Sequence, residues 1–164
     1  MTDKITHCFC FDFRAEEAVA FYLRTFGSGR ILRTSHYGDA VPQHRGRVMM
    51  IEFELFGRAY QALNVGPQFK FGEALSLSVD CADQAEVDRL WAALTAAGGV
   101  DRPCGWVKDR FGLSWQLVPR GLLDLVTSAD PERARRAMEA MMTMNKIDLA
   151  AIRRAADGAE LTSP

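Results

Sequence analysis

Residues 56–63 are FGRAYQAL and residues 111–118 are FGLSWQLV. A shift of 55 positions therefore places Gln61 on Gln116, one aromatic residue on another and one Phe-Gly turn on another. Each turn is followed by a run of residues that predicts a β-strand. Two copies of the same turn and strand in one chain indicate an internal repeat.

Two predicted helices support the same repeat. A shift of 69 positions places Glu17 on Glu86, and it places two large apolar residues on two others. The first helix is expected at about residues 14–26, with Gly27 in the position of a C-terminal cap. The second begins at a capping box that Asp83 forms with Glu86.

The predicted strands complete two copies of the order β-α-β-β-β, with a shorter middle in the second copy. They are expected at residues 4–11, 30–36, 47–55, 58–65, 74–80, 105–109 and 113–119. We predict an α+β fold with two tandem βαβββ modules and a C-terminal helical extension. The expected single domain covers residues 1–157, as module one 1–65, linker 66–73, module two 74–119 and helices 120–157, followed by a frayed tail at 158–164.

The extension begins with a helix start signal at Asp130-Pro131. Methionines follow at helical spacing and are expected to fill an apolar seam, either against the sheet or between two subunits. They are Met138, Met141, Met142 and Met144.

Composition excludes several classes of protein. The chain has 164 residues, 48% of them hydrophobic, and a net charge of −1, which disfavours disorder and nucleic-acid binding. No apolar run approaches the length of a membrane helix, and MTDKITH does not resemble a leader, so we expect a cytoplasmic protein. The four cysteines form no CxxC pair, which disfavours structural zinc, and Cys8 and Cys10 are expected to pack in the core.

The repeat also predicts a site. The 69-residue shift places His7 on Ser76, and the 55-residue shift places Gln61 on Gln116. We expect these four residues to be related by an internal pseudo-twofold axis and to meet in one concavity. His7 as a structural histidine and the glutamines as satisfied core residues remain alternatives. Tyr60 and Trp115 are expected to pack under the helices.

Several segments resemble the PhnB-like family, often labelled 3-demethylubiquinone-9 3-methyltransferase. This family lies within the vicinal oxygen chelate superfamily of glyoxalases, extradiol dioxygenases and bleomycin-resistance proteins. The segments are AEEAVAFY at 15–22, ALNVGPQFKF at 62–71, EVDRLWAAL at 86–94, CGWVKDRFGLSWQLVP at 104–119 and MEAMMTMNKIDLAAI at 138–152. The resemblance implies cupped sheets and a homodimer.

Metal-dependent members of that superfamily take histidine and glutamate ligands from the first and last strands of each module. By this resemblance His7 matches the first histidine, whereas Gln61 and Gln116 replace carboxylates and Ser76, or Ala74, replaces the second histidine. Neutral amides hold a divalent cation poorly. We therefore expect no metal and no other cofactor, and a divalent metal held by His7, Gln61 and Gln116 remains the weaker alternative.

Other candidates lie outside the repeat. The loop at 36–47 contains His36 and Arg47 and is either a lid or a plain solvated loop. Cys104 is a candidate at the pocket mouth. The nearest candidate for a methyl-donor turn, Gly27-Ser28-Gly29, leaves a helix and enters a strand, which is the reverse of the usual geometry. The methyltransferase label is therefore not taken as the activity.

The function predicted from these features is that of a PhnB-like protein that binds a small molecule in a metal-poor pocket. Whether it is an enzyme, and which reaction it catalyses, stays open. The alternatives are a non-catalytic drug-sequestering binder of the bleomycin-resistance type and a metal-dependent lyase, isomerase or dioxygenase. No nucleic-acid or membrane partner is expected.

Overall fold

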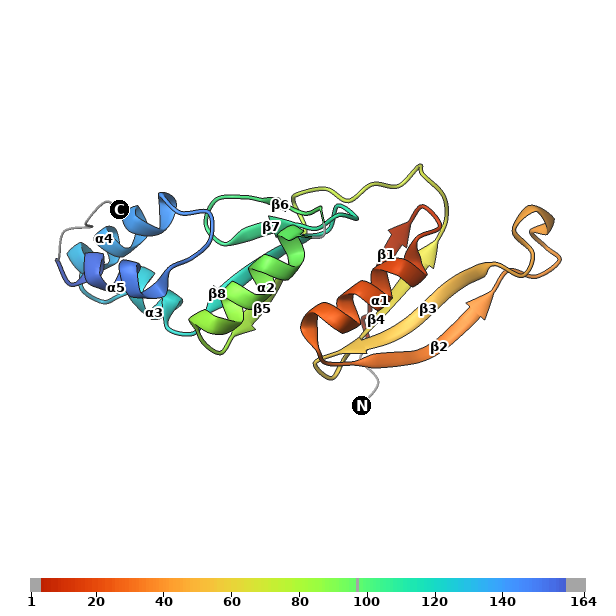
Figure 1. The fold of residues 1–164 in the computed structure, drawn as a ribbon, viewed down its shortest axis with the longest axis horizontal. Coiled ribbons are helices and arrows are strands. Elements are labelled where there is room, and N and C mark those ends of the chain that lie inside the picture. Colours follow the sequence, from red (N-terminus) through yellow and green to blue (C-terminus); the bar gives the residue numbers. More distant parts are fainter. Residues whose placement is uncertain (1–3, 97, 159–164) are drawn as a thin grey trace. The chain divides into compact units, whose positions relative to one another are not determined.

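The structure, a computed structural model, describes residues 4–96 and 98–158. The chain divides into two compact units, residues 1–70 and residues 71–164. Each unit contains one four-stranded sheet with a helix along one face (Figure 1). The predicted α+β fold of two tandem modules with a helical extension is confirmed. The expected tail lies outside the described residues from residue 159 onward.

The first unit forms a sheet in the strand order β1-β4-β3-β2. Its elements are β1 (His7–Phe11), α1 (Ala15–Phe26), β2 (Arg30–His36), the 3-10 turn η1 (Pro42–His44), β3 (Val48–Leu55) and β4 (Arg58–Asn64). β1 is parallel to β4, and the other neighbours are antiparallel. Helix α1 contacts β3 and β4, and between helix and sheet lie Phe9, Phe53 and Tyr22, each at most 2% exposed.

A buried asparagine fixes the start of α1. Asn64 is 1% exposed, and its side-chain oxygen accepts a hydrogen bond of 2.9 Å from the Ala15 N–H. Its side-chain nitrogen donates to Glu16 Oε2 at 2.8 Å and to the Val48 carbonyl at 3.0 Å. Asn64 therefore satisfies a free N–H of the first helical turn and ties β3 to β4. The helix ends at Gly27, as predicted, in the left-handed conformation with φ 63°.

The second unit repeats this arrangement in the order β5-β8-β7-β6. Its elements are β5 (Ser76–Cys81), α2 (Gln84–Ala96), β6 (Val100–Asp101), β7 (Trp106–Lys108) and β8 (Ser114–Pro119). Half of the predicted capping box is confirmed, because Asp83 Oδ1 accepts from the Glu86 N–H at 2.9 Å. The Glu86 carboxylate accepts from the Ala82 N–H at 2.7 Å, one residue before the expected partner. β6 is absent from the prediction, because two residues are too few to show an alternating pattern.

A buried carboxylate holds the turn before β8. Asp109 is 3% exposed, and it accepts hydrogen bonds from the N–H groups of Phe111 at 2.8 Å and Leu113 at 3.0 Å. Its other oxygen accepts from the Trp115 indole N–H at 2.9 Å. Trp115 is 3% exposed and packs on the α2 side of the sheet, as expected. The Phe-Gly turn of the second module is thus positioned by side-chain hydrogen bonds as well as by backbone bonds.

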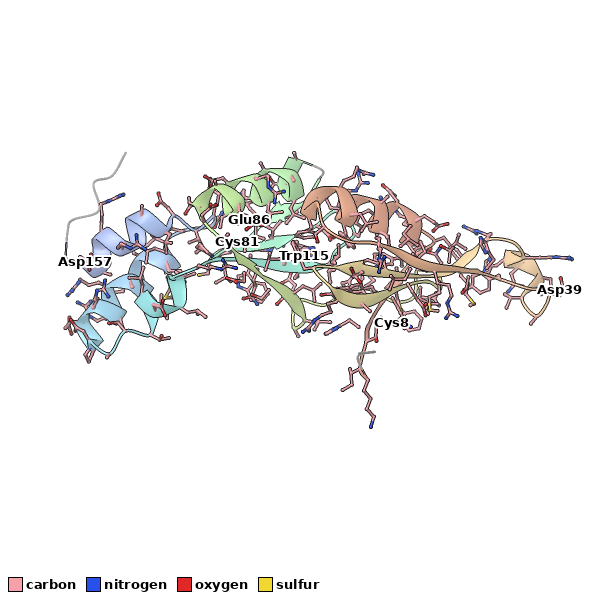
Figure 2. The ribbon with its side chains drawn as sticks, turned by 90° about the horizontal axis from the view of Figure 1, so that it is seen from below. Cys8, Asp39, Cys81, Glu86, Trp115 and Asp157 are labelled. Atoms are coloured by element: carbon pink, nitrogen blue, oxygen red, sulfur yellow. The ribbon has the colours of Figure 1, made fainter. Side chains whose placement is uncertain are left out.

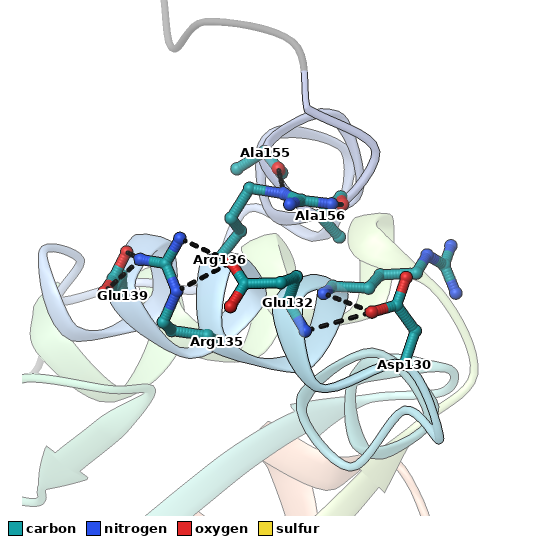
Figure 3. Close-up of polar contacts among 8 residues, drawn as sticks. Asp130, Glu132, Arg135, Arg136, Glu139, Ala155 and Ala156 are labelled. Carbon is teal, nitrogen blue, oxygen red and sulfur yellow. Dashed lines mark hydrogen bonds and ion pairs between the residues drawn. The ribbon is translucent and has the colours of Figure 1, made fainter.

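The extension forms three helices, α3 (Leu122–Val126), α4 (Pro131–Met142) and α5 (Leu149–Ala156). They share a small core that includes Leu122, Ala137 and Ile152. Arg136 of α4 donates to the carbonyls of Ala155 and Ala156 at the end of α5, at 2.7–3.2 Å (Figure 3). The cation thereby satisfies carbonyl groups that the helix end leaves free.

The four methionines of the extension differ in exposure, and a seam between two subunits stays a prediction. Met141 and Met144 pack against the helical core, whereas Met138 and Met142 are 38% and 66% exposed.

In the described part of the chain, every helix is too short or too polar to pass through a bilayer.

Candidate functional site

Strand alternation divides the residues of the first sheet between a face that α1 covers and an open face. In the β1–β4 register His7 lies opposite Tyr60, and Cys8 lies opposite Gln61. The His7 ring is 5.9 Å from the Tyr60 ring, on the side of the buried Phe9. His7 is therefore on the α1 side of the sheet, and Gln61 is on the open side.

Two expectations about this strand are wrong. The prediction that His7 and Gln61 face one concavity fails. His7 is paired with Tyr60, the residue before Gln61 in β4, and consecutive residues of a strand point to opposite faces. The prediction that Cys8 packs in the core also fails, since the aromatic residues of β1 take the buried face and Cys8 is exposed on the opposite one (Figure 2). Cys10, on the same face as Cys8, is half-buried.

The repeat itself holds with a corrected shift for the first strand of each module. Cys8 lies opposite Gln61 in the first sheet, and Ser78 lies opposite Gln116 in the second, so these strands are related by 70 positions. The helices keep the 69-residue shift, because the strand-to-helix connection is one residue shorter in the second module. The mapping of His7 onto Ser76 is therefore wrong by one residue.

The register defines a row of equivalent open-face residues in each sheet. The first row is Cys8, Gln61, Glu52 and Arg33. The second row is Ser78, Gln116, Trp106 and Arg102. The last member of the second row is placed by the Arg102 N–H, which donates to the Trp106 carbonyl at 2.8 Å.

The first row contains an internal ion pair. The Arg33 guanidinium donates to both carboxylate oxygens of Glu52, each at 2.9 Å. A bidentate pair of this kind uses the best hydrogen-bonding geometry of both side chains. At the other end of the row, partial burial and then the charge of Cys10 raise the pKa of the Cys8 thiol. A raised thiol pKa keeps Cys8 protonated near neutral pH and makes it a poor nucleophile.

The open face of the second sheet brings two of the predicted site residues together. Gln116 Nε2 donates to Ser76 Oγ at 2.8 Å. Ser76 and Ser78 are two residues apart in β5, so both belong to the open face together with Gln116. The structure thus pairs Ser76 with Gln116 in the second unit, and it places Gln61 at the equivalent position of the first.

A pocket of about 240 Å³ lies beside this row, lined among others by Trp106, Lys108, Ser114, Arg102 and Glu73. The Lys108 ammonium donates to Glu73 Oε1 at 3.0 Å, and Arg102 Nη2 is 3.7 Å from the same oxygen. The hydrogen bond from Lys108 and the two positive charges lower the pKa of Glu73. The pocket therefore combines two cations, a hydroxyl and an indole on one open sheet face.

The loop at 36–47 is an ordered hairpin tip, with Asp39 at its far end (Figure 2). The Tyr37 N–H donates to the Arg47 carbonyl at 2.9 Å, and the Gly46 N–H donates to the Tyr37 carbonyl at 2.9 Å. Arg47 places its guanidinium 3.9 Å from the centre of the Phe13 ring, a cation–π contact with the turn before α1. His36 is exposed at the end of β2. The role of this segment as a lid stays a prediction.

Cys104 is turned toward the extension. Its N–H donates to the Met144 carbonyl at 2.7 Å, and its half-buried sulfur is 3.8 Å from the Met141 carbonyl. The neighbouring Pro103, which the sequence analysis did not single out, lines the pocket. Glu73 and Lys108 were missed as well, because they are 35 residues apart in sequence and neither carries a motif.

Solved structures of other proteins share this fold. A fosfomycin resistance protein, FosX from Listeria monocytogenes, solved with Mn(II) and 1S,2S-dihydroxypropylphosphonic acid, is 14% identical with a TM-score of 0.52; the alignment covers 72% of this chain and 93% of that one. The protein PA1353 from Pseudomonas aeruginosa is 23% identical with a TM-score of 0.58, covering 70% and 96%. At these identities the likeness concerns the fold.

The chain belongs to the family described as 3-demethylubiquinone-9 3-methyltransferase, whose sequence model matches residues 3–118. A structure with that description, a PhnB protein from Bacillus cereus, is 32% identical with a TM-score of 0.64, and the alignment covers 71% of this chain and 99% of that one. No protein with a curated function matches the chain. The family match ends before α3, so the resemblance noted at 138–152 lies outside it.

The glycine segment of this chain has a structural role. Gly27 caps α1, and a Cβ at Gly29 would lie 1.8 Å from the Glu54 carbonyl oxygen, so glycine is required where β2 starts beside β3. The segment leaves a helix and enters a strand, as predicted. It therefore does not have the strand-to-helix geometry that usually holds an adenosyl methyl donor.

The donor set fits a divalent metal poorly. Among the described residues there is no group of three or more histidine, cysteine or carboxylate side chains that could hold a metal ion. In the first unit, the equivalent open-face positions offer the Cys8 thiol and the Gln61 amide. In the second unit they offer the Ser78 hydroxyl and the Gln116 amide. Glu52, the carboxylate next in the first row, is engaged by Arg33. Hard divalent cations need more negative charge than these groups supply.

Proposed function

We propose that this PhnB-like protein binds a small organic molecule on the open face of its second sheet, without a resident metal. The pocket beside the hydrogen-bonded Ser76–Gln116 pair is the observation that carries the proposal. Ligand sites in proteins combine an apolar wall with a few fixed polar groups, and Trp106 with Lys108 and Ser114 supplies both kinds of surface. The volume of about 240 Å³ suits a fragment-sized ligand.

All three tryptophans, Trp91, Trp106 and Trp115, lie in the second unit, and Trp106 lines the pocket. Tryptophan fluorescence therefore reports on ligand binding in the pocket. A library of small acids, amides and heterocycles is screened by thermal shift, and each hit is then titrated by tryptophan fluorescence. Gln116 lies opposite the pocket residue Trp106 on the open face, so its amide can orient a bound ligand. We expect hits whose affinity falls about tenfold in Gln116→Leu. Gln68→Leu, in the first unit, serves as the matched control. Absence of any hit, or hits unaffected by Gln116→Leu, would contradict the proposal.

The drug-sequestering alternative differs from an enzyme in turnover. A ligand found by the screen is incubated with the protein and recovered, and its chemical identity is checked by mass spectrometry. Unchanged ligand after long incubation favours a binder, and a changed ligand favours an enzyme.

The metal-dependent alternative is tested on chelator-stripped protein. We expect no binding of Zn²⁺, Ni²⁺, Mn²⁺ or anaerobic Fe²⁺ at micromolar concentration in calorimetry. Micromolar binding that is lost in Gln61→Ala or Cys8→Ser, but kept in His7→Ala, would overturn the metal-free proposal at the first row.

We further propose a cytoplasmic homodimer. Sedimentation of the full chain tests the dimer, and fractionation of the source cells tests the location.

A further inference from the structure

The second row differs from the first in how its arginine is neutralised. Arg33 lies opposite Glu52 and forms a bidentate pair with it. The equivalent of Glu52 in the second row is Trp106, so the side chain opposite Arg102 is an indole and not a carboxylate. The acid near Arg102 instead comes from Glu73, ahead of β5.

Glu73 is held in a way that permits exchange. Its side chain is 63% exposed, and both the 3.0 Å contact with Lys108 and the 3.7 Å contact with Arg102 use the single oxygen Oε1. Exposed, single-oxygen ion pairs contribute little to stability, because water and salt compete for both partners. A carboxylate from another molecule can therefore take the place of Glu73 at little cost.

The surroundings of Glu73 indicate the chemistry of such a molecule. Arg102 and Lys108 attract an oxyanion, and the Ser114 side chain adds a donor in the same pocket. Trp106 adds an indole surface on which a flat apolar group can pack. A carboxylate or phosphonate joined to a small ring presents both of these parts.

We propose that Glu73 is an internal stand-in for the acid group of the ligand, and that the pocket binds small ring-bearing carboxylates or phosphonates by exchanging them for Glu73 on Lys108 and Arg102. This inference rests on the proposed function and adds the class of ligand and a competing residue. Glu73 then sets the affinity, because each ligand must displace it before it reaches the cations.

The test uses benzoate and phenylphosphonate as acidic probes and benzamide as the neutral probe of the same shape. The full chain is titrated at low salt by tryptophan fluorescence and calorimetry. We expect both acids to bind, to bind more weakly as salt is added, and to bind at least about tenfold more tightly than benzamide.

Two variants with matched controls separate the exchange from a general charge effect. Glu73→Gln is expected to tighten benzoate binding about three- to tenfold, because the competitor is removed. Asp124→Asn, which changes the net charge equally, is expected to leave it unchanged. Lys108→Met is expected to weaken benzoate binding about tenfold or more, whereas Arg120→Gln, at the exposed ion pair with Asp80, is expected to have no effect.

Three results would overturn the inference. They are equal binding of benzamide and benzoate, no tightening in Glu73→Gln, and no binding of either acid at about 10 mM. In any of these cases a neutral ligand that depends on Gln116 would still support the proposed function, so the two proposals fail separately.

Discussion

The two sheets use equivalent open-face positions in different ways. In the first row the arginine is neutralised inside the sheet, by the acid on the adjacent strand. In the second row an indole takes the place of that acid, and the arginine shares an exposed carboxylate with Lys108. The same backbone arrangement thus gives one face whose arginine is paired within the sheet, and another whose cations share an exposed carboxylate from outside the sheet.

The two units also differ in the buried polar residue that anchors each of them. In the first, the neutral Asn64 ties the start of α1 to the sheet. In the second, the carboxyl group of Asp109 holds the turn before β8 and the Trp115 indole. Hydrogen bonds to a carboxylate are stronger than those to a neutral amide, and loss of Asp109 removes an acceptor from three N–H groups.

The largest expected effect follows from this second difference. Asp109→Ala is expected to lower the free energy of unfolding of the second unit by about 3–5 kcal/mol, since two buried N–H groups and a part-buried one lose their acceptor. Urea unfolding monitored by tryptophan fluorescence measures it, because the tryptophans report on that unit alone. Asp109→Asn keeps one acceptor oxygen and is expected to cost less. A loss below about 1 kcal/mol would contradict the role given to Asp109.

The second prediction concerns a variant that makes the second row resemble the first. Trp106→Glu places an acid opposite Arg102, as Glu52 lies opposite Arg33, and it removes the indole from the pocket. We expect benzoate affinity, measured by calorimetry, to fall at least about twentyfold. Trp91→Phe, on α2, is the control for loss of a tryptophan. Unchanged affinity in Trp106→Glu would show that the second row does not contribute to the site.

The third prediction concerns the position at which β1 and β5 end. Phe11 occupies it in the first module and the fully buried Cys81 in the second (Figure 2). Burial, and then the charges of Glu86 and Asp80, raise the pKa of Cys81 from 9.0 to about 11. The protonated thiol is therefore favoured by folding, so its contribution is complete below pH 9 and is lost as the pH rises toward 11.

Between pH 8 and pH 10.5 the second unit is expected to lose about 1 kcal/mol through this thiol, after allowance for solvent screening. Urea unfolding at the two pH values measures the loss. Cys81→Ala serves as the reference that removes the group while other groups still titrate. Equal losses in the wild type and in Cys81→Ala would contradict the prediction.

The smallest effect is expected in the first row. Glu52→Gln breaks the bidentate pair with Arg33 at a partly exposed site, and we expect a loss of about 0.5–1 kcal/mol. Faster hydrogen exchange of the β2–β3 amides would report it. Glu73→Gln, the matched change in the second unit, is expected to cost still less, because its partners hold a single oxygen. A larger loss in Glu73→Gln than in Glu52→Gln would reverse the comparison between the two rows.

Much of the fold was predictable because its signals are local. The spacing of Ala18, Tyr22 and Phe26 predicted α1, and Gly27 marked its end. Asp83 and Glu86 marked the start of α2. The exact alignment of the two repeats was harder to predict. The connection between β5 and α2 is one residue shorter than that between β1 and α1, which changes the shift from 70 to 69, and no sequence motif marks this difference.

The site was only partly predictable. Gln61 and Gln116 follow from the 55-residue shift, and the open-face register agrees with it. His7 was assigned to the wrong face, because alternation separates the two faces of a strand but does not say which face the helix covers. Glu73 and Lys108 meet through the folded chain, and no local pattern predicts a contact over 35 residues.

Local signals were enough to predict the repeated βαβββ order, the helix ends and the family, because each rests on residues close together in the chain or on matches between segments. Only the folded chain shows the two rows, the contacts of Glu73 with Lys108 and Arg102, and the burial of Asp109 and Cys81. Cross-strand neighbours and burial depend on which strands pair and in which register, and that choice is made by packing over the whole unit.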